Sequence, residues 1–268
     1  MKICDYDTVE WANLARTSYS MEDVGTLKVE ALARRIRRMN PLVEIVACSR
    51  SITDMSTCEQ DELASGVDLV IAGTDQFTAQ AAINEMAVRL EIPAVFIGIH
   101  AQGSGGRVVW TIPRETGCYR CVAAERYAAA ENQNPDQPLD LSAMVGCLID
   151  GQFIDLIALK VAVAILERGR DSAYGRFYQR MKGRNDILVR CHPEYEWGRL
   201  MWDALLADLP KNPKDYATEL QAEAILAMDS LWLKGAVDPN CPVCATQRPQ
   251  RAQVQRALAA YQAGRSNQ

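Results

Sequence analysis

Two pairs of cysteines, each pair separated by two residues, constrain the fold of this chain more than any other feature. The pairs are Cys118-Tyr119-Arg120-Cys121 and Cys241-Pro242-Val243-Cys244. This spacing lets one tight turn direct two sulfurs at a tetrahedral ion, and two such turns supply the four thiolates of a structural zinc site. Such a site would join segments about 120 residues apart and so restrict the unfolded chain. The alternatives are two separate redox pairs or four unrelated core thiols.

Charge and hydropathy argue against two broad classes of protein. The 268 residues include 29 Lys and Arg and 34 Asp and Glu, a formal charge of −5 with no long basic run, so nucleic acid is not expected as a partner. The apolar stretch Phe153 to Leu166 is interrupted by Asp155 and Lys160 and is shorter than the about 20 residues of a membrane span. It predicts a buried helix. Met1 to Asp5 has none of the zones of an export signal, so we expect a cytoplasmic protein whose nine cysteines are mostly thiols or metal ligands.

Strand-like and helix-like segments alternate in the first part of the chain. This order predicts an α/β fold with a Rossmann-like, doubly wound and mostly parallel sheet, whose ligands bind beyond the carboxyl ends of the strands. Asp5 and Asp75 both fall at such ends. The expected strands are Lys2–Tyr6, Val43–Ala47, Val67–Ala72 and Pro93–Ile99, and the expected helices are Val29–Met39 and Phe77–Leu90.

The second half of the chain has a less regular pattern. Arg107–Ile112 is predicted to be a strand of a hairpin or of a sheet edge. Residues 169–239 are harder to interpret, because only a strand at Ile187–Cys191 and a helix at Tyr216–Trp232 are indicated. The other expected elements are a helix at Ala123–Ala130, a surface loop at Glu131–Leu141 and the long apolar helix at Cys147–Glu167.

Several short motifs follow one another in a fixed order. They are Asp5-Tyr6-Asp7-Thr8-Val9-Glu10, Asn13-Leu14-Ala15-Arg16, Asp23-Val24-Gly25 with Lys28, Asn40-Pro41, Gly73-Thr74-Asp75-Gln76 and the two cysteine pairs. Together they resemble the ThiF/MoeB/HesA family, the bacterial relatives of ubiquitin-activating enzymes. The likeness runs from Lys2 to about Leu166 and returns at the last cysteine pair. We therefore expect an adenylation domain at 1–168, an insertion of unknown role at 169–240, and a C-terminal part at 241–268 with half of the zinc knuckle and a helix.

The resemblance implies adenylation of the C-terminal glycine carboxylate of a ubiquitin-like or sulfur-carrier protein, with ATP and Mg²⁺. It also implies roles for single residues: Asp5 at the ribose hydroxyls, Asn13, Arg16 and Lys28 at the phosphates, and Asp75 at Mg²⁺. An attack by a carboxylate on a polyphosphate brings like charges together, so a metal and cations such as Arg16 and Lys28 suit the reaction. The alternatives are ordinary surface cations for Arg16 and Lys28 and a helix N-cap for Asp75. Family members are usually dimeric, so a homodimer is implied as well.

The chain departs from the family pattern at its start. The family opens with a strand and a Gly-rich turn whose N–H groups receive the nucleotide phosphates, and no Gly-rich turn precedes Asp5. We therefore expect an N-terminally incomplete sheet, either because the natural start is missing or because the nucleotide-binding half is incomplete. A missing inner strand would leave Lys2–Tyr6 and its neighbour with unpaired edges, which a second chain could fill. Milder departures are Gln76 and Thr17, where the family has Asn and Gln.

Four further side chains are weaker candidates for catalysis. Some family members carry a catalytic cysteine in the crossing loop, and Glu131–Leu141 has none. Cys147 is the nearest thiol, but it opens an apolar helix, where a buried thiol is the commoner role. Cys191 precedes His192, yet neighbours on a strand point to opposite faces. His100 is expected to be a satisfied core or rim histidine rather than a base.

The sequence leaves three hypotheses for function. The first is an adenylating enzyme of the ThiF/MoeB/HesA type, which Arg16, Lys28 and Asp75 favour. The second is a non-catalytic, zinc-stapled member of the same family that acts as a scaffold or partner subunit, which the absent glycine turn favours. The third is an unrelated dinucleotide-dependent oxidoreductase with a structural zinc.

Overall fold

The computed structural model describes residues 1–100, 103–132, 148–192 and 229–245. Its strands are β1 (Lys2–Cys4), β2 (Val46–Cys48), β3 (Val70–Ala72), β4 (Ala94–Ile99), β5 (Gly105–Thr111), β6 (Asp186–Arg190) and β7 (Asp229–Leu233). Its helices are α1 (Lys28–Met39), α2 (Thr57–Ala64), α3 (Phe77–Arg89), α4 (Tyr119–Val122), α5 (Ala124–Glu131), α6 (Leu148–Leu166) and α7 (Ala173–Met181). Short 3₁₀ turns lie at Trp11–Asn13, Met21–Asp23 and Ile52–Asp54.

The strands form two sheets. One has the order β3-β4-β5-β6-β7, and β1 and β2 form the other. The pairs β1–β2 and β3–β4 are parallel, whereas the pairs from β4 to β7 are antiparallel. The α/β class is confirmed, and the described sheet is mixed rather than mostly parallel. The reason is that β4 ends at Ile99 and β5 begins at Gly105, a connection too short for the crossover that a parallel pair needs.

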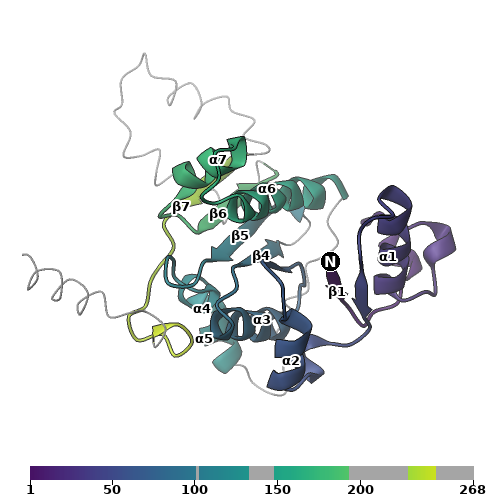
Figure 1. The fold of residues 1–268 in the computed structure, drawn as a ribbon, viewed down its shortest axis with the longest axis horizontal. Coiled ribbons are helices and arrows are strands. Elements are labelled where there is room, and N and C mark those ends of the chain that lie inside the picture. Colours follow the sequence, from purple (N-terminus) through teal and green to yellow (C-terminus); the bar gives the residue numbers. More distant parts are fainter. Residues whose placement is uncertain (101–102, 133–147, 193–228, 246–268) are drawn as a thin grey trace, which may run out of the picture.

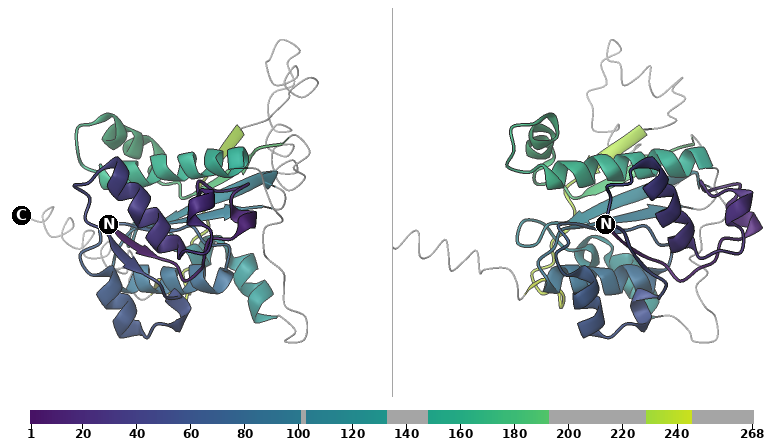
Figure 2. Two further views of the ribbon diagram at one scale, coloured as in Figure 1. Left: turned by 90° about the vertical axis from the view of Figure 1, so that its right-hand side faces the viewer. Right: turned by 45° about the vertical axis from the view of Figure 1, so that its right-hand side comes forward.

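Helices cover both faces of the five-stranded sheet (Figure 1), as the two further views in Figure 2 also show. Helices α6 and α7 pack on one face, and α3, α4 and α5 pack on the other. The side chains of β5 alternate between the two layers, as the pleat of a strand requires: Val108 and Trp110 join the core under α6, and Val109 joins the opposite core. The predicted hairpin strand at Arg107–Ile112 is thus confirmed, and it lies inside the sheet rather than at its edge.

The predicted long helices agree with the structure, since α1, α3 and α6 begin and end within one residue of the predicted bounds. Among the described residues, no helix has both the length and the apolar character that a bilayer span requires. The predicted helix at Tyr216–Trp232 is wrong at its C-terminal end, because β7 occupies residues 229–233 and Trp232 packs edge-on against Trp110 and Phe177. Residues 216–228, and most of the predicted loop Glu131–Leu141, lie outside the described residues.

Two side-chain hydrogen bonds hold the small sheet beside β3. Lys2 Nζ donates to the carbonyl of Ser65 at 2.8 Å, and Gln76 Nε2 donates to the Tyr6 hydroxyl at 2.7 Å. Within the described part of the chain, β1 pairs only with β2 and β3 only with β4. Ile71 of β3 is 49% exposed, whereas interior strands of parallel sheets are usually buried on both faces. The unpaired edges agree with the expectation of an incomplete inner sheet.

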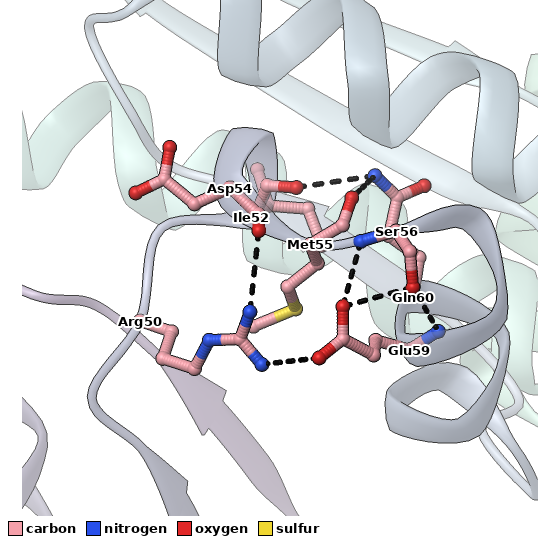
Figure 3. Close-up of polar contacts among 7 residues, drawn as sticks. All are labelled: Arg50, Ile52, Asp54, Met55, Ser56, Glu59 and Gln60. Carbon is pink, nitrogen blue, oxygen red and sulfur yellow. Dashed lines mark hydrogen bonds and ion pairs between the residues drawn. The ribbon is translucent and has the colours of Figure 1, made fainter.

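A polar network fixes the connection from β2 to α2 (Figure 3). Arg50 donates to Glu59 Oε1 at 2.7 Å and to the carbonyl of Asp54 at 3.2 Å. The second carboxylate oxygen of Glu59 accepts from the backbone N–H and the hydroxyl of Ser56, both at 2.8 Å, which forms a capping box at the start of α2. The bonds from Arg50 and Ser56 hold the pKa of Glu59 at about 2. The network therefore joins the segment after β2 to the helix that leads toward β3.

Candidate functional site

The four cysteines of the two pairs lie together in the core. The Sγ atoms are 3.7 Å apart for Cys118 and Cys241, 3.6 Å for Cys121 and Cys244, and 4.0 Å for Cys118 and Cys121. Four sulfurs at about 2.3 Å from a tetrahedral zinc ion would lie about 3.8 Å from one another. All four residues are buried, and their sulfurs all lie within 4.8 Å of one another. The predicted grouping is confirmed, and the arrangement can hold a structural zinc ion.

Neighbouring groups hold this cysteine cluster in place. Asn84 of α3 lies within hydrogen-bonding distance of Cys118, with 3.8 Å between Nδ2 and Sγ, and its carbonyl oxygen accepts from the N–H of Tyr119 at 3.0 Å. A Cβ atom on Gly117 would lie 2.4 Å from the carbonyl oxygen of Ala236, so a glycine is needed where the two cysteine-bearing segments approach. Such supporting contacts orient metal ligands. A bound ion would therefore fasten the segment after β7 to α3 and α4.

The turn after β1 brings predicted site residues together. Asp5 Oδ1 accepts from the N–H of Asp7 at 2.8 Å, which closes the expected turn. Asp7 in turn forms an ion pair with Lys28, with 2.7 Å between Oδ2 and Nζ, and its carbonyl accepts from the N–H of Lys28. Burial and then the charges of Asp5 and Asp23 raise the pKa of Tyr19, which places its phenol in the electrostatic field of Asp5. Asp7 thus links the turn that carries Asp5 to Lys28 at the start of α1.

Asn13 and Arg16 lie on the 3₁₀ turn and the loop that follow. Asn13 is 6% exposed, and its side-chain oxygen accepts from the N–H of Glu10 at 2.9 Å. Its carbonyl accepts from the N–H groups of Arg16 and Thr17, so Asn13 shapes the loop that carries Arg16. Arg16 is exposed, and among the described residues no carboxylate lies within ion-pair distance of its guanidinium. Arg16 is therefore open to an anionic ligand.

Asp75 lies beyond the end of β3 and is exposed. The Thr74 hydroxyl accepts from the N–H of Gln76, and Gln76 is itself the N-cap position of α3. The alternative role of Asp75 as a helix N-cap is therefore not supported. The bond from Gln76 to Tyr6 joins the segment after β3 to the segment after β1. This contact brings the chain segments of Asp75 and Asp5 to the same edge of the molecule.

A buried glutamine, which the sequence analysis did not single out, organises the carboxyl ends of β3 and β4. Gln80 is 1% exposed, and its amide nitrogen donates to the carbonyls of Thr74 at 2.8 Å and Ile97 at 3.0 Å. Its oxygen accepts from the Tyr119 hydroxyl at 2.6 Å and from Arg126 at 2.8 Å. Gln80 thus connects both strand ends to α4 and α5. In the sequence, Gln80 lies on the buried face of a predicted helix, where a polar residue needs hydrogen-bond partners. This position was the signal that could have indicated its role.

His100 follows β4 near this group. Burial, and then the positive charges of Arg107 and Arg126, lower its pKa to about 4. Arg107 itself forms a two-pronged ion pair with Asp186, with both N–O distances at 2.7 Å. His100 is therefore neutral at physiological pH and a weak base, as expected for a core or rim histidine.

Cys191 and His192 both contact Asp150 at the start of α6. The sulfur of Cys191 lies 4.0 Å from the carbonyl oxygen of Asp150, and His192 Nε2 lies 3.2 Å from its carboxylate. The expectation that the two side chains point apart fails because β6 ends at Arg190, before the pair. Burial and then the charge of Asp150 raise the pKa of Cys191 to about 11, so it is a poor nucleophile at neutral pH. Cys147, the other candidate thiol, lies outside the described residues.

Comparisons with known proteins give one family. The sequence profile described as "ThiF family" matches residues 1–194. Ubiquitin-like modifier-activating enzyme 5 of Arabidopsis thaliana is 30% identical over an alignment of 131 residues, and the match covers 44% of this chain and 30% of that protein. The enzyme of the same name from Drosophila mojavensis is 33% identical over an alignment of 137 residues, and the match covers 48% of this chain and 34% of that protein. The matched part is thus about a third of each of these relatives.

Solved structures give the same fold. The chain superposes on E. coli MccB with succinimide with a TM-score of 0.55 at 15% sequence identity, covering 91% of this chain and 58% of that one. E. coli MccB with ATP gives a TM-score of 0.51 at 16% identity, with the same two coverages. At these identities the likeness establishes the fold alone.

Proposed function

The chain belongs to the ThiF family, and on that premise we propose that it is an adenylyltransferase that activates the C-terminal carboxylate of a ubiquitin-like or sulfur-carrier protein with ATP and Mg²⁺. In this reaction a carboxylate oxygen bonds to the α-phosphorus while the bond to the β-phosphate oxygen breaks, so that pyrophosphate leaves. The ubiquitin-like class of partner is supported by the names of the curated relatives. The family match favours this chemistry over a dinucleotide-dependent oxidoreductase.

The observation that carries the proposal is the hydrogen bond between Tyr6 and Gln76. It brings the acidic turn after β1 beside the acidic turn after β3. Carboxylates suit both tasks that the reaction sets at this edge, since Asp5 can accept hydrogen bonds from ribose hydroxyls and Asp75 can ligate Mg²⁺. Bound Mg²⁺ would supply charge neutralisation at the phosphates.

The cations at this edge would serve the phosphates. Arg16 presents a planar donor fork that matches phosphate oxygens, and Lys28 supplies a point charge that Asp7 already orients. Asn13 would hold the loop of Arg16 in place through the bonds of its side chain and carbonyl. Donor groups fixed before the reaction lower its barrier without reorganisation.

The cysteine cluster supports a second element of the proposal, a structural zinc ion bound by Cys118, Cys121, Cys241 and Cys244. Four thiolates fill a tetrahedral shell and leave no position for water, so the ion would stabilise the fold and take no part in catalysis. The described cysteines are free thiols rather than disulfides, which suits the reducing cytoplasm that we propose as the compartment. A homodimer completes the proposal, by analogy with the family.

Exchange of labelled pyrophosphate into ATP, measured with a candidate carrier protein, tests the activity. We expect exchange with the wild-type chain and a loss of about a hundredfold in Asp75→Ala, because Mg²⁺ would lose its protein ligand. Asp68→Ala is the matched control, since Asp68 is also exposed but precedes β3 instead of following it. Exchange that persists in Asp75→Ala would remove this residue from the metal site.

A second candidate function is that of a partner subunit without activity of its own. The unpaired edges of β1 and β3 and the exposed Ile71 favour it, because a strand from another chain would complete the sheet there. Under this hypothesis the chain alone gives no exchange, and exchange appears only when a second family member is added. Exchange by the purified chain alone would rule this candidate out.

A further inference from the structure

Two cysteines face each other at the carboxyl ends of β1 and β2. Cys4 is the last residue of β1 and Cys48 is the last residue of β2, and the parallel register pairs them directly. Paired residues of neighbouring strands direct their side chains to the same face of the sheet. Cys4 is exposed and Cys48 is partly buried, although cysteine is among the residue types most often fully buried. An exposed cysteine contributes little to packing, so its reactivity is what distinguishes it from other small residues.

The sulfur of Cys4 is directed toward β2. Its thiol donates a hydrogen bond to the carbonyl of Arg50 at 3.1 Å, and Arg50 lies two residues beyond Cys48. Burial, followed by interactions with the Cys48 thiol, raises the pKa of Cys4 to about 12, and such interactions require the two sulfur atoms to lie close together. Adjacent strands lie about 4.8 Å apart, which is inside the range of about 4.4 to 6.8 Å between the Cα atoms of a disulfide. The spacing of the strands therefore suits a disulfide between Cys4 and Cys48.

We propose that Cys4 and Cys48 form a redox-modification site, which a low-molecular-weight disulfide such as glutathione disulfide converts reversibly to an intramolecular disulfide. Both residues are free thiols in the structure, which therefore shows the reduced state of the pair. Disulfides in reducing compartments are usually transient, and redox sensing is one of their roles. The inference goes beyond the proposed function and does not depend on adenylation.

The oxidation consists of two thiol–disulfide exchanges. Cys4 carries almost no thiolate at neutral pH, so Cys48 reacts first. The Cys48 thiolate bonds to one sulfur of glutathione disulfide, and the other glutathione leaves as a thiolate. Cys4 then gives its proton to the solvent, and its sulfur attacks Cys48, which breaks the mixed disulfide and releases the second glutathione. Overall, the two cysteine thiols lose two electrons and two protons, and glutathione disulfide gains them as it is reduced to two molecules of glutathione.

The site lies directly beside the turn of Asp5. Asp5 follows Cys4 in the sequence, and its N–H donates to the carbonyl of Cys48 at 3.1 Å. Oxidation would remove the hydrogen atom that Cys4 donates to Arg50, the residue that joins the segment after β2 to α2 (Figure 3). It would also add a covalent bond next to the backbone hydrogen bond between Asp5 and Cys48. The modification would thus fasten the acidic turn after β1 to the end of β2.

Peptide mapping of the full chain in glutathione buffers tests the site. Trypsin places each relevant thiol on a separate peptide: Cys4 on 3–16, Cys48 on 39–50 and Cys58 on 51–89. After acid quenching and alkylation, we expect glutathione disulfide to link peptides 3–16 and 39–50, and dithiothreitol to separate them.

The dependence on glutathione concentration distinguishes the intramolecular disulfide from a mixed disulfide. Formation of the intramolecular bond releases two molecules of glutathione for each molecule of glutathione disulfide, whereas a mixed disulfide releases one. At a fixed ratio of glutathione to glutathione disulfide, a tenfold dilution of both should therefore raise the ratio of linked to reduced pair about tenfold. The proportion of any mixed disulfide should stay constant.

Single variants separate the two exchanges. Cys4→Ser blocks the second exchange, so we expect peptide 39–50 to retain one glutathione on Cys48. Cys48→Ser should form no linked peptide. Cys58→Ser is the matched control at an exposed thiol outside the pair, and it should form the linked peptide as the wild type does. Thermal unfolding of each variant confirms that it is folded, and the mapping of the wild-type chain needs no variant.

Three results would overturn the proposal. In the first, Cys4 and Cys48 both remain open to alkylation in buffers that place glutathione on Cys58. In the second, the wild-type chain retains glutathione on Cys48 and forms no link between peptides 3–16 and 39–50. In the third, the linked fraction does not change on dilution at a fixed ratio. Because the readout is peptide mass, an absence of pyrophosphate exchange would count against the proposed function alone.

Discussion

Gln76 Nε2 donates a 2.7 Å hydrogen bond to the hydroxyl of Tyr6, across 70 residues of sequence. The contact links the segments that follow β1 and β3, which belong to different sheets. Lys2 makes the corresponding contact at the amino ends, to the carbonyl of Ser65. Side chains rather than strand pairing thus hold the acidic turn of Asp5 beside that of Asp75.

Removal of either partner of this bond is expected to weaken the association of the two sheets. In a double-mutant cycle of Tyr6→Phe and Gln76→Ala, we expect a coupling of about 0.5 to 1 kcal/mol in the free energy of unfolding, because one exposed hydrogen bond is lost. Urea denaturation measures it. Tyr174→Phe, on another exposed tyrosine, should give no coupling with Gln76→Ala. Strict additivity of the first pair would show that the bond contributes nothing.

Loss of one cysteine from the cluster is expected to release the metal. Metal analysis of the wild-type chain should find about one zinc ion per chain, and Cys241→Ser should find almost none, because three thiolates bind the ion more weakly. The free energy of unfolding should fall by about 3 kcal/mol or more, since metal binding is coupled to folding. Cys58→Ser, at an exposed thiol, is the control, and it should keep the wild-type zinc content and free energy of unfolding. Full zinc content in Cys241→Ser would contradict the site.

Local patterns in the sequence predicted much of this fold. Helical spacing of apolar residues located α1, α3 and α6 within one residue, and the strand-like segment Ile187–Cys191 located β6 within one residue. The strand at β7 was missed because Leu231, Trp232 and Leu233 suit a helix as well as a strand, and pairing with β6 decides between them. The capped helix α2 was missed although Ser56 and Glu59 carry the capping-box signal.

The candidate site was predicted less completely, because its geometry depends on contacts between distant residues. Two Cys-x-x-Cys pairs indicated the cysteine cluster, since the spacing alone carries that chemistry. No local pattern could show that Asp7 orients Lys28, because 21 residues separate them. The Gln80 network likewise joins elements whose proximity only the folded chain establishes.

Acid is expected to destabilise the protein partly through His100. Its folded-state pKa of about 4 lies below the value near 6.5 of an unfolded histidine, so the unfolded chain binds the extra proton first as pH falls. The neutral imidazole contributes its full stabilisation above pH about 6.5. This contribution is lost as the pH falls toward 4, and about 2 kcal/mol of it is lost by pH 5. Urea unfolding at pH 7 and pH 5 should show a smaller difference in His100→Gln than in the wild type. His192→Gln, at a half-exposed side chain, is the control. If His100→Gln and the wild type lose the same stability between pH 7 and pH 5, the assignment of this loss to His100 is contradicted.

Asp7 is expected to act on the nucleotide through Lys28. In Asp7→Asn the ammonium group loses its partner at 2.7 Å, so we expect the KM for ATP in pyrophosphate exchange to rise severalfold with a smaller change in kcat. Lys28→Met should have a larger effect, because the cation itself is lost. Asp23→Asn breaks another ion pair of the same region, with Arg34, and should leave KM unchanged. Equal effects of Asp7→Asn and Asp23→Asn would show that the region responds to stability alone.

Cys191 is expected to be chemically inert and dispensable for activity. Its thiol is 4% exposed, and its pKa is raised to about 11, so almost no thiolate forms at pH 8. Iodoacetamide at pH 8 should therefore label the exposed Cys58 long before Cys191, as peptide mass spectrometry of the folded protein would show. Cys191→Ser should retain pyrophosphate exchange and transfer of the activated carboxylate. Cys191→Ala, which introduces no hydroxyl, shows whether any loss in Cys191→Ser comes from burying that hydroxyl. Rapid labelling of Cys191, or loss of transfer with exchange intact in both variants, would instead identify it as the nucleophile that accepts the activated protein.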